Sequence, residues 1–494
     1  MIKRVLIYWS LLFISLPALS ASWPMQLLPG DYPDPTILRD GDDYYMTHSP
    51  FWYHPGFLIW HSNDLFNWEP IVRVMEEYEG SLMAPELIKH NEKYYLYYPT
   101  SKGEIFVITS ENIKGPWSDP VKLEVNGIDP GHISDSEGNR YLFTNNGWIV
   151  PLSQDGLEVT GERKKVYDGW IYPDSWETEG DDMWLESPKL FFYKGFYYMV
   201  SAEGGTAGPP TSHMCVVARS ESPSGPWENS PYNPLVHTYS KSDNWWSKGH
   251  GTIIQDKDDN WWIIYHGYAN GYHTLGRQTL IEPIEYTSDG WFMSKSEIVD
   301  NVPVQKKFGF DLNDDFSDSK PGLQWSFWKE NGSEHIKIED NILKMKAKGN
   351  SLPEGRIMLV TPQDKYYEIQ VEVKPGIENK AGLLLFYNEK VYAGIMTDSS
   401  DIYIYNDADN IKKIENSFGK SLRFKMLNRG NNLDIYVHND NNDSWSCLVK
   451  DLYVGDMHHN YHKEFLALRP ALISVGNDEA EFKDFKYSKI EFSE

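Results

Sequence analysis

The sequence predicts an all-β protein, a five-bladed β-propeller followed by a β-sandwich of the jelly-roll type. One observation is a strand pattern that recurs five times up to about residue 302. The other is a series of short strands in which apolar and polar residues alternate. These strands are separated by Asn, Asp and Gly turns and extend from there to residue 494. We therefore expect a propeller domain over 22–302 and a sandwich domain over 303–494.

Each copy of the repeat has a small residue or proline, an apolar strand, a polar turn and an aromatic-rich strand, as in YPDPTILRDGDDYYM (32–46). The copies are marked by Asp34, Ala84, Asp129, Glu186 and His250, which are 50, 45, 57 and 64 residues apart. This period, with about four short strands per copy, is typical of propeller blades. About twenty strands in one open sheet would expose too many edges, so closure into a ring is favoured.

Propeller geometry brings together residues that are far apart in the sequence. The first strand of each blade lines the central channel, so the residues at its entrance converge on one axis. Three of the five entrance residues are acidic: Asp34, Asp129 and Glu186. One such Asp alone is explained by turn capping, but three carboxylates in one funnel repel each other and raise at least one pKa. Their convergence favours glycoside hydrolysis, which needs an acid and a base on opposite sides of the sugar.

Composition and charge narrow the class of partner. Aromatic residues make up 15% of the chain, with 19 Trp and 32 Tyr. Such a surplus fits either stacking on sugar rings or aromatic-rich strands, and composition leaves both open. The formal net charge of -26 repels phosphate backbones and anionic lipid surfaces. We therefore expect an oligosaccharide or polysaccharide partner, with no nucleic acid and no membrane insertion.

The first 21 residues have the build of a secretory signal peptide: Lys3 and Arg4, then an apolar stretch, then small residues. The protein is expected to be exported and soluble, in the periplasm or secreted. No other apolar run approaches the ~20 residues that a membrane span needs. The two cysteines, Cys215 and Cys447, fall in different predicted domains and are expected to be buried thiols rather than a disulfide.

Eight motifs follow one another over about residues 30–292: YPDPTIL, HPGFLIWHSNDLFNWE, MAPELIKHNEKYYLYY, GIDPGHI, WLESPKLF, SAEGGT, KGHGTII and LGRQTLIEPIEYTSDGWF. In kind and in order they resemble those of glycoside hydrolase family 43. Within the family, AEGGT and LGRQTLIEP followed by a β-rich tail most resemble the β-xylosidase branch, with α-L-arabinofuranosidases close by.

The resemblance implies a role for each acidic residue. Asp34 matches the general base that activates water, Glu186 the general acid, and Asp129 the carboxylate that tunes and orients the acid. Physical reasoning agrees, since a charge on Asp129 raises the pKa of Glu186 and keeps its proton available. The family inverts the anomeric carbon, which implies acid and base carboxyl groups roughly 6.5 to 9.5 Å apart.

Further candidate residues match the family's site. Arg277 is the expected substrate clamp, because a guanidinium offers forked donors to sugar hydroxyls; the alternative is a surface ion pair. His250 matches a histidine near an ion or water on the propeller axis, where calcium with mostly water ligands would fit. Glu203, in the Gly-rich loop SAEGGTAGPP, is a minor candidate for substrate binding, and the alternative is a plain connector.

Aromatic residues next to the motifs are candidates for stacking on the sugar. The candidates are Phe51, Trp52, Trp170, Trp184, Trp245 and Trp246. We prefer Trp52 and Trp184, although each position alone is more often explained by packing.

The predicted sandwich shows half-buried strands such as YYEIQVEVKP, which alternates apolar and polar residues. It resembles the concanavalin-like sandwich of the xylosidase branch, with DDFSD near its start and AEFKDFKY near its end. Asp314 and Asp315 are candidate calcium ligands, although acidic turns are commonly only solvated. The sequence leaves open whether the sandwich narrows the active site, binds polysaccharide or only stabilises the propeller.

The leading hypothesis is an exported, inverting exo-glycosidase that removes terminal β-xylosyl or α-L-arabinofuranosyl residues from plant or algal glycans, with xylose preferred. No cofactor is required, and a structural calcium ion is left open. The alternatives are another family 43 specificity such as a galactosidase, a retaining fructosidase-type propeller, and a sugar-binding propeller without catalysis. The sequence motifs of the fructosidases do not occur in this chain, which argues against the fructosidase alternative. All three carboxylate residues are present, which argues against a propeller without catalysis.

Overall fold

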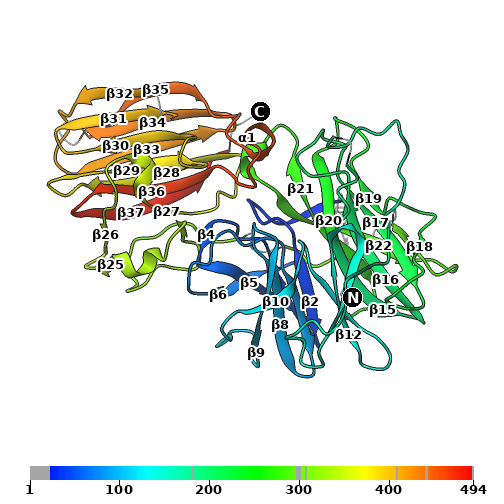
Figure 1. Ribbon diagram of the computed structural model, residues 1–494. Coiled ribbons are helices and arrows are strands. Elements are labelled where there is room, and N and C mark those ends of the chain that lie inside the picture. Colours follow the sequence, from blue (N-terminus) through cyan, green and yellow to red (C-terminus); the bar gives the residue numbers. More distant parts are fainter. Residues whose placement is uncertain are drawn as a thin grey trace, which may run out of the picture.

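The computed structural model describes residues 23–180, 182–295, 302–305, 309–407, 410–439 and 443–491. Two bodies lie side by side, a propeller built from the blue to green part of the chain and a sandwich from the yellow to red part (Figure 1). The predicted signal peptide lies outside the described residues. The fold class predicted from the sequence is confirmed.

The propeller has five blades, each a small antiparallel sheet, as the five-fold repeat predicts. Blade I contains β2 (Thr36–Asp40), β3 (Asp43–Thr47), β5 (Gly56–Ser62) and β6 (Glu69–Met75). Blade II contains β7 (Glu86–His90), β8 (Lys93–Pro99), β9 (Glu104–Ser110) and β10 (Val121–Asn126). Blade III contains β11 (Gly131–Ser134), β12 (Arg140–Thr144), β13 (Trp148–Leu152) and a short β14 (Lys164–Lys165).

Blade IV contains β15 (Glu186–Tyr193), β16 (Phe196–Glu203), β17 (Met214–Ser220), β18 (Glu228–Asn229) and β19 (Val236–His237). Blade V contains β20 (Trp245–Gln255), β21 (Trp261–Ala269), β22 (Gln278–Tyr286) and β23 (Phe292–Ser294). Its remaining strand is β1 (Met25–Leu28), which pairs antiparallel with β22 and so ties the N-terminal part of the propeller to its last blade.

The innermost strands form a closed ring. β2 contacts β7 and β20, β11 contacts β7 and β15, and β15 contacts β20. Apolar side chains fill the space between neighbouring blades in five separate clusters, one for each blade interface. Because burial of apolar surface fixes each blade against its neighbours, the entrance residues of the inner strands are held in fixed relative positions.

The sandwich packs an eight-stranded sheet on a seven-stranded one around one large apolar core. The first sheet runs β32 (Asn410–Glu415), β31 (Asp401–Asn406), β30 (Tyr392–Thr397), β29 (Asn379–Phe386), β36 (Arg469–Gly476), β27 (Arg356–Leu359), β24 (Ser326–Trp328) and β4 (Tyr53–His54). The second runs β25 (Ile336–Glu339), β26 (Ile342–Lys346), β37 (Glu479–Lys489), β28 (Tyr366–Lys374), β33 (Leu422–Arg429), β34 (Asn432–Asn439) and β35 (Ser444–Tyr453).

Helical structure is sparse in the described part of the chain. It consists of α1 (His459–His462) and four short 3-10 segments, η1 (Asn145–Gly147), η2 (His273–Leu275), η3 (Gly332–His335) and η4 (Leu352–Glu354). Nothing in these ranges forms a helix with the length and apolar character that spanning a membrane requires.

The two domains are joined by more than the covalent chain. Strand β4 comes from the blade I segment but pairs with β24 of the sandwich, and Tyr53 packs in the sandwich core. Arg469 of the sandwich forms a buried ion pair with Asp31, at 3.1 Å, and its guanidinium lies 3.4 Å from the centre of the Tyr53 ring. These contacts fix the sandwich against the entrance side of the propeller.

The prediction for the cysteines is half right. Cys215 is a buried thiol, but Cys447 is exposed, with its sulfur close to the Val449 carbonyl. Cys447 lies in β35, the edge strand of its sheet, where side chains can reach solvent and the pairing with β34 is irregular.

Candidate active site

The three acidic entrance residues line one pocket of about 310 Å³ at the end of the propeller channel. Asp34 precedes β2, Asp129 precedes β11, and Glu186 is the first residue of β15. Asp34, Asp129 and the fifth-blade residue His250 all have positive φ, at 59°, 53° and 56°. Because this region is uncommon for residues other than glycine, its recurrence at three blade entrances marks a site where backbone strain aims side chains inward.

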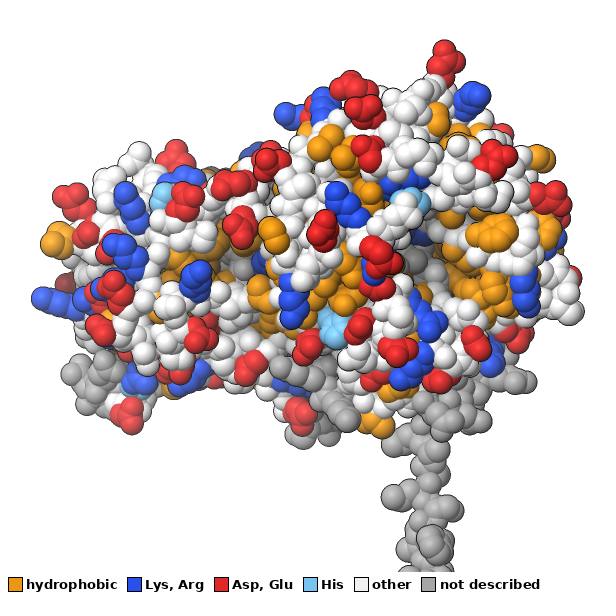
Figure 2. Space-filling view, turned by 90° about the horizontal axis from the view of Figure 1, so that it is seen from below, with side chains coloured by type: hydrophobic (Ala, Val, Ile, Leu, Met, Phe, Trp, Pro, Cys, Tyr) orange, Lys and Arg blue, Asp and Glu red, His pale blue; other side chains and the backbone are white. Residues whose placement is uncertain are grey.

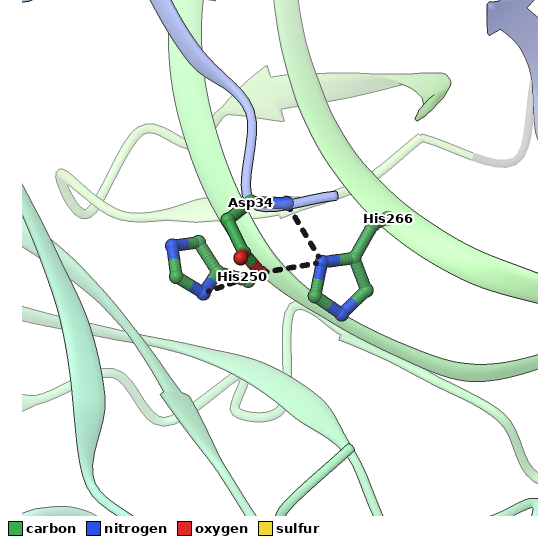
Figure 3. A group of neighbouring side chains, drawn as sticks. All are labelled: Asp34, His250 and His266. Atoms are coloured by element: carbon green, nitrogen blue, oxygen red, sulfur yellow. Dashed lines mark hydrogen bonds and ion pairs between the residues drawn. The ribbon is translucent and has the colours of Figure 1, made fainter. Parts of the chain in front are cut away.

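Asp34 is held by four neighbours. Figure 3 shows its carboxylate between the rings of His250 and His266, whose Nδ1 atoms lie 3.4 and 3.2 Å from Asp34 Oδ1. Arg277 Nη1 donates to the same oxygen at 2.9 Å, and the Ser49 hydroxyl donates to the other oxygen at 2.5 Å. The Asp34 carboxylate is therefore fixed in position, with one oxygen facing the charged guanidinium.

The charge state of Asp34 follows from these contacts. Burial by itself would raise the pKa of Asp34, but Arg277 and the histidines outweigh it and hold the pKa well below its usual range. Burial lowers the pKa of both His250 and His266, so the permanent positive charge near Asp34 is that of Arg277. Asp34 is thus an ionised carboxylate, as a general base must be.

Glu186 and Asp129 are shifted in the opposite direction. Burial and the charge of Asp129 raise the pKa of Glu186 well above its usual range. Burial and the charge of Asp34 raise the pKa of Asp129 to about 7. Ligand atoms of Asp129, Glu186 and His250 all lie within 4.8 Å of one another. The pocket therefore contains an ionised carboxylate and a protonated one, which is the division of charge that acid and base catalysis needs.

A buried ion pair lies under the pocket on the propeller axis. Lys189 Nζ is 2.6 Å from Glu86 Oε2 and also donates to the Pro85 carbonyl at 2.8 Å. Glu86 accepts in turn from the Thr36 hydroxyl and from the His132 backbone. This network joins blades I to IV, and the positive charge of Lys189 opposes the rise in the pKa of Asp129.

Aromatic side chains form the walls. Phe51 stacks on Phe465 with ring centres 5.7 Å apart, and the Arg277 guanidinium lies 5.5 and 5.2 Å from these two rings. Trp184 lines another part of the pocket, is 44% exposed, and donates from its indole to the Glu179 carbonyl. The walls thus offer apolar ring faces around a charged floor.

The sandwich supplies part of this pocket, a point that the sequence leaves open. His459, Lys463 and Phe465, in and just after α1, are among the lining residues. The Tyr268 hydroxyl of β21 is 3.0 Å from His459 Nδ1, which ties α1 to the propeller. The sandwich therefore narrows the pocket mouth.

The predicted binding residues divide into two groups. Arg277, His250 and Trp184 line the pocket. Trp52 does not, because Phe51, whose φ is 49°, faces the pocket, whereas Trp52 lies in the turn that follows and lines a neighbouring cavity. Glu203 is fully buried behind the lining residues, where its Oε1 accepts from the Trp170 backbone at 2.7 Å.

The residues around His250 fit a directly bound calcium ion poorly. Calcium takes six to eight oxygen ligands, whereas this place offers a histidine nitrogen and carboxylates. One of these carboxylates is already paired with Arg277, and the pKa values of the other two are raised. His250 Nε2 is buried without a hydrogen-bond partner in the described structure, so its environment suits a water molecule.

The predicted calcium ligands of the sandwich are occupied by local hydrogen bonds. Asp314 accepts from the Phe316 backbone and the Trp325 indole, and Asp315 accepts from the Ser317 backbone. Within the described ranges, no third acidic or histidine side chain joins this pair at metal-binding distance. The arrangement is that of an acidic turn.

Several residues that line the pocket or contact Asp34 have no signal in the sequence that would single them out. His266 lies within β21 in a continuous apolar run, and Ser49 and Glu179 lie in irregular segments. Phe465 reaches the site only through domain packing. Phe51 is the exception, because it is among the aromatic candidates that the sequence offers. It directly precedes Trp52, and the sequence does not show which of the two side chains faces the pocket.

The chain is similar in sequence to known glycosyl hydrolases. The model of glycosyl hydrolases family 43 matches residues 26–292. A non-reducing end α-L-arabinofuranosidase from Bacteroides ovatus is 29% identical over 66% of this chain and 65% of its own length. A β-xylosidase from Bacillus subtilis is 31% identical over 54% of this chain and 55% of its own. The chain thus matches between about half and two thirds of the length of each of these relatives.

Solved structures agree on the fold over both domains. A xylan β-1,4-xylosidase from Bacillus halodurans superposes with a TM-score of 0.84 at 24% identity, covering 94% of this chain and all of the other. A family 43 protein from Bacillus licheniformis gives a TM-score of 0.83 at 24% identity, covering 94% of this chain and 99% of the other. The propeller followed by a sandwich is therefore an arrangement that is shared with these proteins.

Proposed function

Because the chain belongs to family 43 of the glycosyl hydrolases, we propose that it is an exported, inverting exo-glycosidase that releases terminal β-xylosyl or α-L-arabinofuranosyl residues from glycans. The observation that carries the proposal is the pairing of an ionised Asp34 with a protonated Glu186 in one pocket. The names of the relatives support xylose and arabinofuranose as the sugars.

The reaction follows from the two carboxyl groups. Asp34 takes a proton from a water molecule as the water oxygen bonds to the anomeric carbon. The bond to the leaving oxygen breaks on the opposite side of the sugar, and Glu186 gives its proton to that oxygen. Asp129, beside Glu186, favours the protonated acid and orients it. Two proton exchanges with solvent restore the starting state, and no cofactor is needed.

The pocket walls account for exo action in this proposal. A cavity of about 310 Å³, with the stacked rings of Phe51 and Phe465 in its wall, has room for a terminal sugar rather than for the middle of a chain. Arg277, already bonded to Asp34, has further donors that can orient the sugar hydroxyls.

A panel of aryl β-xylosides, α-L-arabinofuranosides and β-galactosides tests the proposal. We expect hydrolysis of the xyloside, with slower or comparable hydrolysis of the arabinofuranoside and little of the galactoside. Preference for the galactoside would mean that the protein releases galactose rather than xylose or arabinofuranose. Binding of free sugars without hydrolysis of any aryl glycoside would favour the non-catalytic propeller.

A further inference from the structure

A second cavity lies beside the active-site pocket and has a volume of about 390 Å³. We call it the Trp52 pocket. It lies at the rim of blades I and II, and its lining includes Trp52, Ser81, Tyr98, Thr100, Ser101 and Lys102. Figure 2, a view of the molecule from below, shows acidic and basic side chains mixed over the surface, with hydrophobic side chains gathered in places between them.

The two cavities share a wall. Phe51 and Leu82 exchange backbone hydrogen bonds, and Leu82 is bridged in turn to Thr100. On either side of this ladder, Phe51 and Met83 line the active-site pocket, whereas Trp52 and Ser81 line the Trp52 pocket. Residues two apart in an extended chain are about 7 Å apart. Ser81 and Met83 therefore bring the two linings to within about 7 Å of each other, a distance that a short oligosaccharide can span.

The lining has the chemistry of a sugar site. Lys329 Nζ lies 4.6 Å from the centre of the Trp52 ring, so the ring is held in place by the sandwich while it lines the cavity. Tyr98 is 1% exposed and is part of the cavity lining. An aromatic ring beside several hydroxyl groups and a Lys102 ammonium is suited to stack on a sugar and to bond its hydroxyls.

We propose that the Trp52 pocket is a distal saccharide subsite, which binds the part of the glycan chain that remains after the terminal sugar in the active-site pocket is cut off. The inference rests on the proposed function, since it takes the scissile bond to lie between the two cavities. It also gives Trp52 a role in substrate binding that the active-site pocket does not provide.

Two variants test the subsite by opposite means. Trp52→Ala removes the ring, and Ser101→Trp, at an exposed turn, fills the cavity without disturbing the domain interface. For each, kcat/KM is measured on xylotetraose and on xylobiose. We expect the wild-type protein to prefer the tetraose and the tetraose-to-biose ratio to fall about fivefold or more in both variants. Phe192→Ala, which removes an exposed ring on blade IV, is the matched control and should keep the wild-type ratio.

A binding measurement separates this inference from the proposed function. In the Glu186→Gln background, calorimetry with xylohexaose and with α-1,5-arabinohexaose measures chain binding without turnover. Weaker binding of either chain after Trp52→Ala or Ser101→Trp supports the subsite, whatever the aryl glycoside panel shows. The inference is overturned if neither chain binds, if both variants bind as tightly as the parent, or if the tetraose-to-biose ratio is unchanged.

Discussion

Replacement of Asp34 by Asn is expected to lower kcat by about three to four orders of magnitude, with KM changed little. The amide keeps the shape of the side chain and can still accept from Arg277, but it cannot take a proton from water. The loss therefore falls on the chemical step. Steady-state kinetics on an aryl xyloside measures it.

Asp40→Asn is the matched control, because Asp40 lies at the far end of β2, the strand that Asp34 precedes, and pairs with Lys89 and Tyr94 outside the pocket. Near wild-type rates are expected for it. If Asp34→Asn retained more than about a tenth of the wild-type kcat, Asp34 could not be the general base.

Replacement of Glu186 by Gln should make the rate depend strongly on the leaving group. A dinitrophenyl group departs without a proton, so its glycoside should still be cleaved at a substantial rate. An alkyl or sugar leaving group needs protonation, and its hydrolysis should fall by about three orders of magnitude or more. Rates across a series of aryl glycosides with leaving phenols of different pKa measure this dependence.

The pH profile gives a second readout of Glu186. Its raised pKa means that the wild-type enzyme loses activity as the pH rises through that value, because the acid is then deprotonated. In Glu186→Gln, this alkaline fall should be absent from the residual hydrolysis of a glycoside whose leaving group needs protonation. Glu282→Gln is the control, since burial also raises the pKa of Glu282 but this residue does not line the pocket. If the leaving-group dependence in Glu186→Gln were the same as in the wild-type protein, Glu186 could not be the general acid.

The propeller and its three carboxylates can be predicted from the sequence because a repeat places equivalent residues at equivalent points of a closed ring. Asp34, Asp129 and Glu186 stand at the same place in three copies, so their convergence follows from the repeat alone. The closure of blade V by β1 has no such signal, because β1 is one short strand outside the repeat.

The walls of the site depend on features that a repeat does not encode. The choice between Phe51 and Trp52 is settled by local backbone geometry, since Phe51 has a φ of 49° and lines the same pocket as the three carboxylates. Phe465 reaches the site because the sandwich docks through the Asp31–Arg469 pair and strand β4. Contacts between domains of this kind leave no periodic pattern in the sequence.

The catalytic proposal requires that Asp34 activates water and does not itself bond to the sugar. Proton NMR of the first sugar released from an aryl β-xyloside, recorded before the anomers equilibrate, tests this most directly. Direct attack by water predicts that the α-anomer appears first. Initial release of the β-anomer would mean that a carboxylate forms a covalent intermediate, and it would contradict the roles assigned to Asp34 and Glu186.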